Sequence, residues 1–174
     1  HYDSSKKISN KRKKLLYLGY LRKAKGIDTV IKSFALLQNK IPEAELTIVG
    51  DGETKTKQDL HEIINQNSIT NVHFLGHIDN RTRLNDIMRN HDIFCFASLS
   101  EGSPRVIIES MANGLNIVST PVGSLPHIFF DDRDIVYFDF NNSKMLYEKV
   151  LFLINNNNNA SLIRESAHQK VKKY

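Results

Sequence analysis

The sequence predicts an α/β fold, a three-layer Rossmann-like domain with a parallel sheet of about six strands. Two observations carry this prediction. Six apolar runs of four to six residues alternate along the chain with segments whose apolar residues recur at helical spacing. The run 92–97 has no polar alternation after Asp92, as expected for a strand covered by helices on both faces.

The first half of the chain contains three strand–helix pairs. Strand 15–20 ends in a turn and leads into helix 27–40, whose apolar stripe stops before Pro42. Two glycines close strand 45–49, and a single glycine closes strand 72–75. The intervening segments with inward apolar residues predict helices 57–66 and 82–90.

The second half continues the alternation. Helix 104–113 follows strand 92–97, with Pro104 in its first turn and Gly114 after its end. The remaining expected elements are strand 116–120, a short helix at 125–129, strand 135–138, and helices 145–154 and 162–171. The five asparagines at 155–159 are expected to form a loop between the last two helices.

Composition places these elements in one domain. The chain has 174 residues, 40% hydrophobic and 25% charged, with a single cysteine and no apolar run near the ~18 residues that cross a bilayer. One cysteine excludes a disulfide framework, and Cys95 lies in an apolar run as an inert core thiol. We therefore expect residues 15–174 to form one Rossmann-like domain.

The charge is concentrated at the two ends of the chain. The net charge is 24 − 19 = +5, and residues 1–14 carry six Lys/Arg against one Asp. We interpret 1–14 as a basic linker or a vector-derived remnant. Residues 164–174 add +3, so the body between is at −3. A nucleic-acid-binding protein carries its positive charge on the folded body, whereas this chain carries it at the ends, so nucleic acid is not expected as a partner.

The predicted sheet places the ligand site at one edge. In such sheets ligands bind at the carboxyl ends of the strands, near the switch in strand order. That rule selects the loops that follow the first five strands, 19–26, 50–53, 76–79, 98–104 and 120–124.

The segment 98–114 is the most informative of these regions. A buried strand ends there, and a small-residue loop leads directly into a helix, whose first amides, at 105–107, are expected to form an anion site. Gly102 allows a ligand to approach the backbone closely. Glu109, one turn further, suits vicinal sugar hydroxyls. By spacing alone, Glu101 and Glu109 are equally well read as surface charges.

At this segment the sequence resembles the retaining glycosyltransferases of the large family 4 group. Glu101 and Glu109 reproduce the E-x7-E signature, and Ser110–Val118 is similar to the run that follows it. The supporting stretches, in order, are Gly19–Gly26, Leu46–Gly52, Asn71–Gly76 and Thr120–Pro126. The resemblance implies one half of a GT-B fold, the C-terminal domain that binds the donor, with the N-terminal acceptor domain outside this chain.

The resemblance also implies roles for individual residues. Glu109 binds the ribose hydroxyls, and Glu101 contacts the transferred sugar and supports the departing group. Lys25 neutralises charge on the leaving diphosphate, so Glu101 and Lys25 are the expected catalytic residues. The other expected nucleotide-sugar-binding residues are Gly19, Arg22, Gly76, His77, Ile78, Gly102, Ser103, Val106 and Ile107.

Three departures from the family pattern affect the phosphate site. Tyr20 stands where the family has arginine, and it donates one hydrogen bond without neutralising charge. Arg22 or Lys23 in the same loop is the alternative cation. Ala24 replaces an acidic residue, and Ser124 and His127 replace a glycine and a glutamate of the family.

Metal sites are the weaker interpretation of two motifs. Asp132-Arg133-Asp134 spells the D-x-D of metal-dependent glycosyltransferases. Its place before the last strand favours a solvated turn, and the fold resembles the metal-independent class. A zinc site at His73 and His77 would need at least one more ligand from elsewhere, and His73 is expected on a strand face. We expect no metal or other cofactor, the donor being a UDP-, GDP- or other nucleotide sugar.

The leading functional hypothesis is a glycosyltransferase domain. With its N-terminal domain it transfers a hexosyl or related sugar, with retention, to a glycan or lipid-linked acceptor of a bacterial envelope polysaccharide or glycolipid. The expected location is the cytoplasm, with peripheral association at the inner membrane face, and the isolated domain is expected to be inactive. A stand-alone nucleotide-binding or regulatory module is the alternative, although no G-x-G-x-x-G follows the first strand. A third hypothesis is a partner subunit that has lost activity, as Tyr20 suggests.

Overall fold

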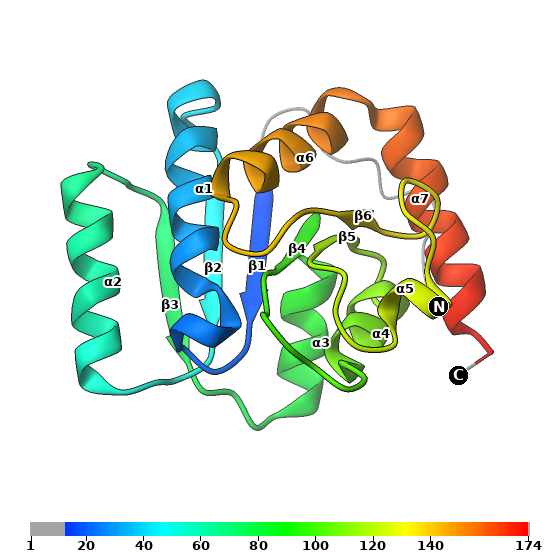
Figure 1. The fold of residues 1–174 in the computed structure, drawn as a ribbon, viewed down its shortest axis with the longest axis horizontal. Helices are drawn as coiled ribbons and strands as arrows, with labels where there is room; N and C mark the ends of the chain where they lie inside the picture. Colours follow the sequence, from blue (N-terminus) through cyan, green and yellow to red (C-terminus); the bar gives the residue numbers. More distant parts are fainter. Residues whose placement is uncertain (1–12, 174) are drawn as a thin grey trace.

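The computed structural model describes residues 13–173, which form a six-stranded, wholly parallel sheet (Figure 1). The strands are β1 (Lys14–Leu18), β2 (Glu45–Val49), β3 (Val72–Gly76), β4 (Ile93–Phe96), β5 (Asn116–Ser119) and β6 (Val136–Tyr137). Their spatial order is β3-β2-β1-β4-β5-β6. From β1 the first three strands are added toward one edge of the sheet, and from β4 the last three are added toward the other edge. The strand order therefore switches between the neighbouring strands β1 and β4.

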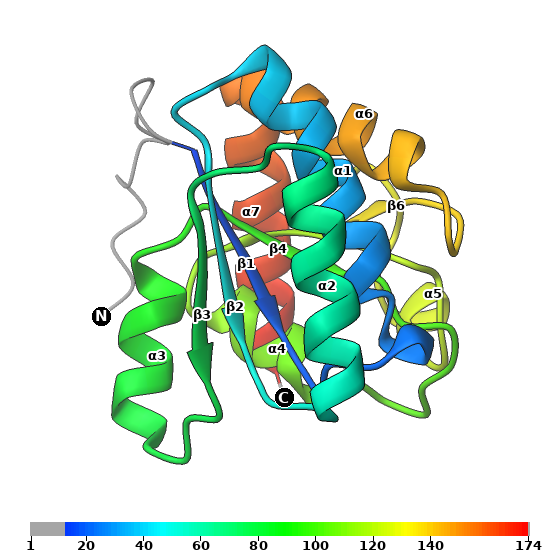
Figure 2. The ribbon, with the colours of Figure 1, turned by 90° about the vertical axis from the view of Figure 1, so that its left-hand side faces the viewer.

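Helices cover both faces of this sheet. They are α1 (Ile27–Lys40), α2 (Thr54–Gln66), α3 (Arg81–Arg89), α4 (Arg105–Ala112), α5 (Leu125–Ile128), α6 (Ser143–Asn155) and α7 (Asn157–Val171). A short 3-10 helix, η1 (Lys23–Lys25), precedes α1. In the side view the sheet separates α3 from α1 and α2 (Figure 2).

Each face of the sheet carries its own hydrophobic core. Leu15 and Tyr17 of β1 pack with α1, α2 and α6, whereas Leu16 faces the opposite core with α3, α4 and the end of α7. Alternate residues of one strand thus enter different cores, because successive side chains of a strand point to opposite faces. The three-layer Rossmann-like prediction is confirmed.

Most predicted elements are present, with shifted ends. The bounds of α1 and β2 agree with the prediction. Helix α2 begins at Thr54 instead of residue 57, and β1 ends at Leu18 instead of residue 20. The prediction that Pro104 lies in the first turn of a helix is also wrong, since Pro104 is the extended cap residue of α4.

The asparagine run is not the loop that the sequence predicts. Helix α6 continues to Asn155, only Asn156 is non-helical, and α7 starts at Asn157. Two contacts outweigh the low helix propensity of asparagine at this junction. The side-chain amide of Asn156 donates to the carbonyl of Phe152 at 2.8 Å, and Ala160 is fully buried in the first turn of α7.

The ends of the chain and its charges bear on other predictions. Residues 1–12 of the predicted basic linker lie outside the described residues, and β1 begins at Lys14, one residue before the predicted domain start.

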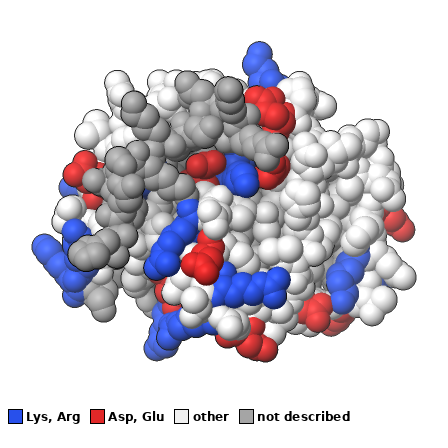
Figure 3. All heavy atoms as spheres, turned by 180° about the vertical axis from the view of Figure 1, so that it is seen from behind, with Lys and Arg blue, Asp and Glu red and all other residues white. Residues whose placement is uncertain are grey.

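On the face opposite to that of Figure 1, acidic and basic side chains are interspersed (Figure 3). In the described part of the chain, no helix has the length and apolar character to span a bilayer.

Asp134 is a buried ion-pair centre, and not part of a solvated turn as the sequence suggested. Its side chain is 1% exposed. It accepts hydrogen bonds from Lys170 at 2.7 Å and Ser166 at 2.6 Å on α7, and it pairs with Arg133. Burial alone would raise the pKa of Asp134, but these donors outweigh it and hold the pKa well below its usual value.

An Asp134→Asn variant is expected to be about 2 kcal/mol less stable at pH 7, because two cations and a hydroxyl lose a buried carboxylate. The folded pKa lies below the unfolded one, so the carboxylate stabilises the fold above about pH 4 and ceases to do so as the pH falls through the folded value. The stability difference from wild type should therefore shrink in acid.

Urea denaturation at pH 7 and pH 3 measures this difference. The matched control is Asp132→Asn in the same turn. Asp132 is exposed, and its one ion pair in the described residues, with Lys149, is long at 3.8 Å. That variant should stay within about 0.5 kcal/mol of wild type. Equal effects of the two substitutions would contradict the assignment of Asp134 as the buried centre.

Candidate functional site

Two loops at the β1–β4 switch are joined by backbone contacts. The amide of Leu99, after β4, donates to the carbonyl of Ala24 in η1 at 2.9 Å. Gly26, which ends η1 and begins α1, has φ +66°, and a Cβ on it would lie 2.1 Å from the Ala97 carbonyl oxygen. This close approach places Lys25 beside the loop that contains Glu101.

Lys25 and Glu101 form the ion pair at the centre of this region. The Lys25 ammonium donates to Glu101 Oε1, which also accepts from the buried Ser98 hydroxyl at 2.7 Å. Partial burial would raise the pKa of Glu101, but the hydrogen bonds from Lys25 and Ser98 prevail and keep its pKa lowered. Glu101 is therefore a carboxylate at neutral pH.

A pocket of about 220 Å³ opens over this ion pair. It brings together four of the predicted site residues, Gly19, Lys25, Glu101 and Val106, from three separate segments. The other lining residues are Tyr17, Leu18, Tyr20, Phe96 and Pro104. The pocket lies at the carboxyl ends of β1 and β4, the place that the switch in strand order predicts.

The start of α4 forms one wall of the pocket. No hydrogen bond within residues 13–173 engages the amide of Val106. The amide of Ile107 is not unpaired as the sequence predicts, because it donates to the Pro104 carbonyl at 3.1 Å, and the Ile107 side chain is fully buried. The first turn is closed by an i→i−3 bond, which the sequence does not reveal.

The loop before α4 is tied to the loop after β5. The Gly102 carbonyl accepts from the amide of Ser124 at 2.9 Å, and the Ser103 and Ser124 hydroxyls are 3.3 Å apart. A Cβ added at Gly102 would meet no atom within 4 Å. Gly102 is thus exposed, and its neighbours are held in place.

Glu109 lies one turn beyond Val106 and has a partner that the sequence analysis missed. Its Oε1 accepts from Arg81 Nη2 at 3.0 Å. Arg81 is the first residue of α3, 28 positions earlier in the chain. No periodicity or motif relates the two residues, so only the packing of α3 beside α4 could reveal the pair.

The segment after β3 lies at the same edge of the sheet. Gly76 has φ +68°, and its carbonyl accepts from the amide of Gly50 at 2.9 Å. His77 is exposed and contacts Asp79 at 2.6 Å, whereas Ile78 packs against the core that contains α4. These three predicted residues are two strands away from β1 and do not line the pocket described above.

Two residues qualify the predictions for the first loop. Arg22 is exposed and is absent from the pocket lining. Its carbonyl accepts from the Lys25 amide at 2.9 Å, and its positive charge contributes to the lowered pKa of Glu101. Tyr20 does line the pocket and is 52% exposed. Its carbonyl accepts from the hydroxyl of Tyr17, which is buried with a raised pKa owing to desolvation and the nearby Asp28 and Glu101.

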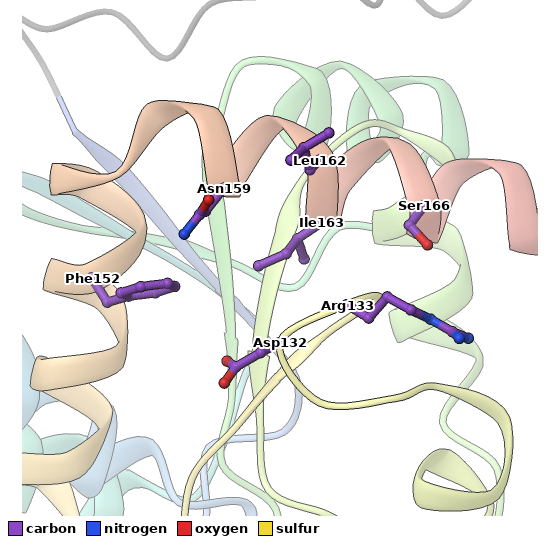
Figure 4. A pocket seen from close by; sticks show the side chains of 7 residues that line it. All are labelled: Asp132, Arg133, Phe152, Asn159, Leu162, Ile163 and Ser166. Carbon is purple, nitrogen blue, oxygen red and sulfur yellow. The ribbon is translucent and has the colours of Figure 1, made fainter.

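A larger hollow of about 590 Å³ lies elsewhere, between α6, α7 and the turn at 131–134 (Figure 4). Phe152 of α6 and Ile163 of α7 contribute its apolar walls. No predicted site residue lines it, and its Arg133 and Ser166 both bind the structural carboxylate of Asp134. Size alone therefore does not identify the functional site.

The two motifs that the sequence analysis weighed as metal sites are not part of a larger ligand set. Among residues 13–173, no group of three or more His, Cys, Asp or Glu side chains is arranged to hold a metal ion. Of the D-x-D motif, Asp134 is engaged by α7. Cys95 is buried as expected, and burial raises the pKa of its thiol to about 12.

The pocket at the switch point combines groups that suit an anionic sugar derivative. An ammonium and the amide end of a helix favour phosphate oxygens. Carboxylates at Glu101 and Glu109 accept hydrogen bonds from hydroxyls. Glu101 lines the pocket, whereas Glu109 lies one turn along α4, outside the pocket lining.

Comparison with known proteins adds independent findings. The sequence profile of the family described as glycosyl transferases group 1 matches residues 2–170. An uncharacterized glycosyltransferase of Methanocaldococcus jannaschii is 38% identical over 104 residues, which are 59% of this chain and 24% of that protein. Alignments with the first three curated relatives cover 24% to 43% of their length, so this chain spans less than half of them.

Solved structures share the fold. The C-terminal domain of a glycosyl transferase group 1 family protein from Francisella tularensis superposes with a TM-score of 0.86 at 22% identity, covering 92% of this chain and 85% of that one. The Anabaena protein HepE in complex with UDP gives 0.85 at 20% identity, covering 94% of this chain and 44% of that one. HepE has also been solved with UDP-glucose.

Proposed function

The chain belongs to the glycosyl transferases group 1 family, and from that premise we propose that its switch-point pocket binds a nucleotide-diphosphate sugar. The diphosphate lies at the start of α4 against Lys25, and the ribose hydroxyls bind Glu109. The transferred sugar contacts Glu101. The base packs against the segment Gly76–Ile78 through main-chain contacts.

The observation that supports this proposal most strongly is the Lys25–Glu101 pair beside the first turn of α4. When the anomeric C–O bond breaks, negative charge develops on the leaving diphosphate. A fixed ammonium and the positive end of a helix stabilise that charge without reorganising during the reaction. Glu101 keeps Lys25 in place and presents its other oxygen to the sugar.

The proposal extends to the whole enzyme. A second, N-terminal domain supplies the acceptor site, because this chain spans less than half of its relatives. The reaction is retaining transfer of a hexosyl or related sugar to a glycan or lipid-linked acceptor in envelope polysaccharide or glycolipid synthesis. It takes place in the cytoplasm, at the inner face of the membrane when the acceptor is lipid-linked, and this chain alone binds the donor without transferring it.

We propose further that the donor site works without a metal ion or other cofactor. Lys25 and the α4 amides take the charge-neutralising role that a divalent cation has in metal-dependent transferases. Addition of EDTA should leave nucleotide affinity unchanged. A loss of affinity in EDTA that Mg²⁺ or Mn²⁺ restores would contradict this part of the proposal.

Titration calorimetry with UDP, GDP and their sugars tests the donor assignment. A Glu109→Ala variant is expected to bind the preferred nucleotide at least tenfold more weakly, because two charge-assisted hydrogen bonds to ribose are lost. Glu62→Ala on α2 is the matched control, since Glu62 is an exposed helix glutamate outside the pocket.

Three outcomes would overturn the assignment. Binding of AMP or NAD in place of sugar nucleotides would support a stand-alone nucleotide-binding module. A folded chain with no nucleotide binding would support an inactive partner subunit, for which Tyr20 in the pocket is the favouring observation. Unchanged affinity in Glu109→Ala would remove the ribose role from that residue.

A further inference from the structure

We infer that Arg81 is a positioning residue for ribose recognition, acting through Glu109. Its guanidinium holds Oε1 of that carboxylate at 3.0 Å, so that Oε2 faces the sugar hydroxyls. The inference rests on the proposed role of Glu109 in binding the nucleotide. It assigns a function to a residue on α3 that belongs to none of the motifs in the sequence.

The frame that places Arg81 over Glu109 is rigid. The start of α3 is capped by Asn80, whose side chain accepts from the amide of Arg83 at 2.9 Å. One helical turn beyond Arg81, Asn85 Oδ1 accepts a hydrogen bond from the side-chain amide of Asn113 at 3.2 Å.

These two contacts are spaced alike on both helices. Residues 81 and 85 are four apart on α3, and residue 109 of α4 is four before Asn113, the residue that caps the end of α4, so each pair lies on one side of its helix. The Asn113 amide also donates to the Glu109 carbonyl at 2.9 Å. Two cross-links one turn apart therefore fix the register of α3 against α4 and set the direction from which Arg81 reaches Glu109.

Stability alone does not account for the pair. The Arg81 side chain is 82% exposed and that of Glu109 is 38% exposed, and such surface ion pairs stabilise a fold little. A free glutamate side chain, however, loses rotamer freedom when it binds a ligand. Because Arg81 orders the carboxylate beforehand, less of that loss falls on nucleotide binding. A carboxylate accepts about four hydrogen bonds, so one oxygen remains available.

The test compares nucleotides with and without the ribose 2′-hydroxyl. Titration calorimetry of this chain uses UDP against 2′-deoxy-UDP and, in parallel, GDP against 2′-deoxy-GDP. For the preferred base, wild type should favour the ribonucleotide about tenfold. Arg81→Gln should weaken ribonucleotide binding about tenfold and deoxynucleotide binding less, because a deoxynucleotide offers Glu109 only its 3′-hydroxyl, and so should reduce the preference.

Two further variants separate positioning from general charge. Arg81→Lys keeps the charge and one donor, so it should retain part of the ribose preference. Arg83→Gln removes an exposed arginine side chain from the same helix and should bind like wild type. All variants should melt at the wild-type temperature, since both arginines are exposed.

The outcomes are distinct. An equal loss of both nucleotides in Arg81→Gln would overturn the inference, because it would show a long-range charge effect. A gain in ribonucleotide affinity would also overturn it, since Arg81 would then compete with ribose for Glu109. If wild type binds no nucleotide, or if Glu109→Ala binds like wild type, the proposed function itself fails and the inference fails with it.

Discussion

A Gly26→Ala variant is expected to lose about 3 kcal/mol or more of folding free energy. Two costs add at this position. An alanine at φ +66° is strained, and its Cβ would lie 2.1 Å from the Ala97 carbonyl oxygen and 2.6 Å from the Ala97 Cβ. Neither neighbour is the movable end of a long side chain, so the backbone of η1 or of the segment after β4 has to shift.

The same shift should damage the site. Lys25 directly precedes Gly26, and the contact of η1 with the end of β4 places its ammonium beside Glu101. We therefore expect Gly26→Ala to lose nucleotide affinity even at temperatures where the variant is folded. Stability is measured by urea denaturation and affinity by calorimetry.

Gly102→Ala is the matched control for this prediction. A Cβ at Gly102 meets no atom within 4 Å and the residue has no positive φ, so its stability should stay within about 0.5 kcal/mol of wild type. Its nucleotide affinity should still fall if the ligand approaches the backbone there. Wild-type stability in Gly26→Ala would show that η1 does not pack against β4 in the way described.

The sequence predicts those parts of the fold that depend on local periodicity and turn chemistry. The stripe of α1 and the apolar run of β4 are visible because each side chain's environment follows from its spacing. Proximity of Lys25 and Glu101, 76 residues apart, came from family resemblance together with the rule that ligands bind at the carboxyl ends of strands.

Three features that sequence reasoning missed depend on packing between distant segments. Arg81 reaches Glu109 because α3 and α4 share one face of the sheet. Asp134 is buried because α7 crosses the turn that contains it, and donors from α7 make that burial favourable. The helical asparagines at 157–159 follow from the burial of Ala160. In each case tertiary contacts override local propensity.

Replacing Lys25 by methionine is expected to reduce affinity for UDP, or for GDP if that base is preferred, by about 10- to 100-fold. Charge-assisted hydrogen bonds of an ammonium to phosphate contribute about 1.5–3 kcal/mol, and the family arginine that would share this charge is Tyr20 here. Affinity for the nucleoside should be unchanged, because it has no diphosphate. Lys32→Met on α1 has the same change in charge at an exposed site outside the pocket and serves as the control.

The partner carboxylate makes this prediction more specific, because its removal should act in the opposite direction. Glu101 is ionised at neutral pH, since its pKa is lowered. If the diphosphate binds Lys25 as proposed, the negative charge of Glu101 opposes it, so Glu101→Gln should strengthen UDP binding while it weakens transfer in the proposed two-domain enzyme, in which we expect the carboxylate to contact the sugar. If both substitutions weaken binding equally, the pair is structural and Lys25 does not bind the diphosphate. Opposite signs, with nucleoside affinity constant, would assign the phosphate to Lys25 and the sugar to Glu101.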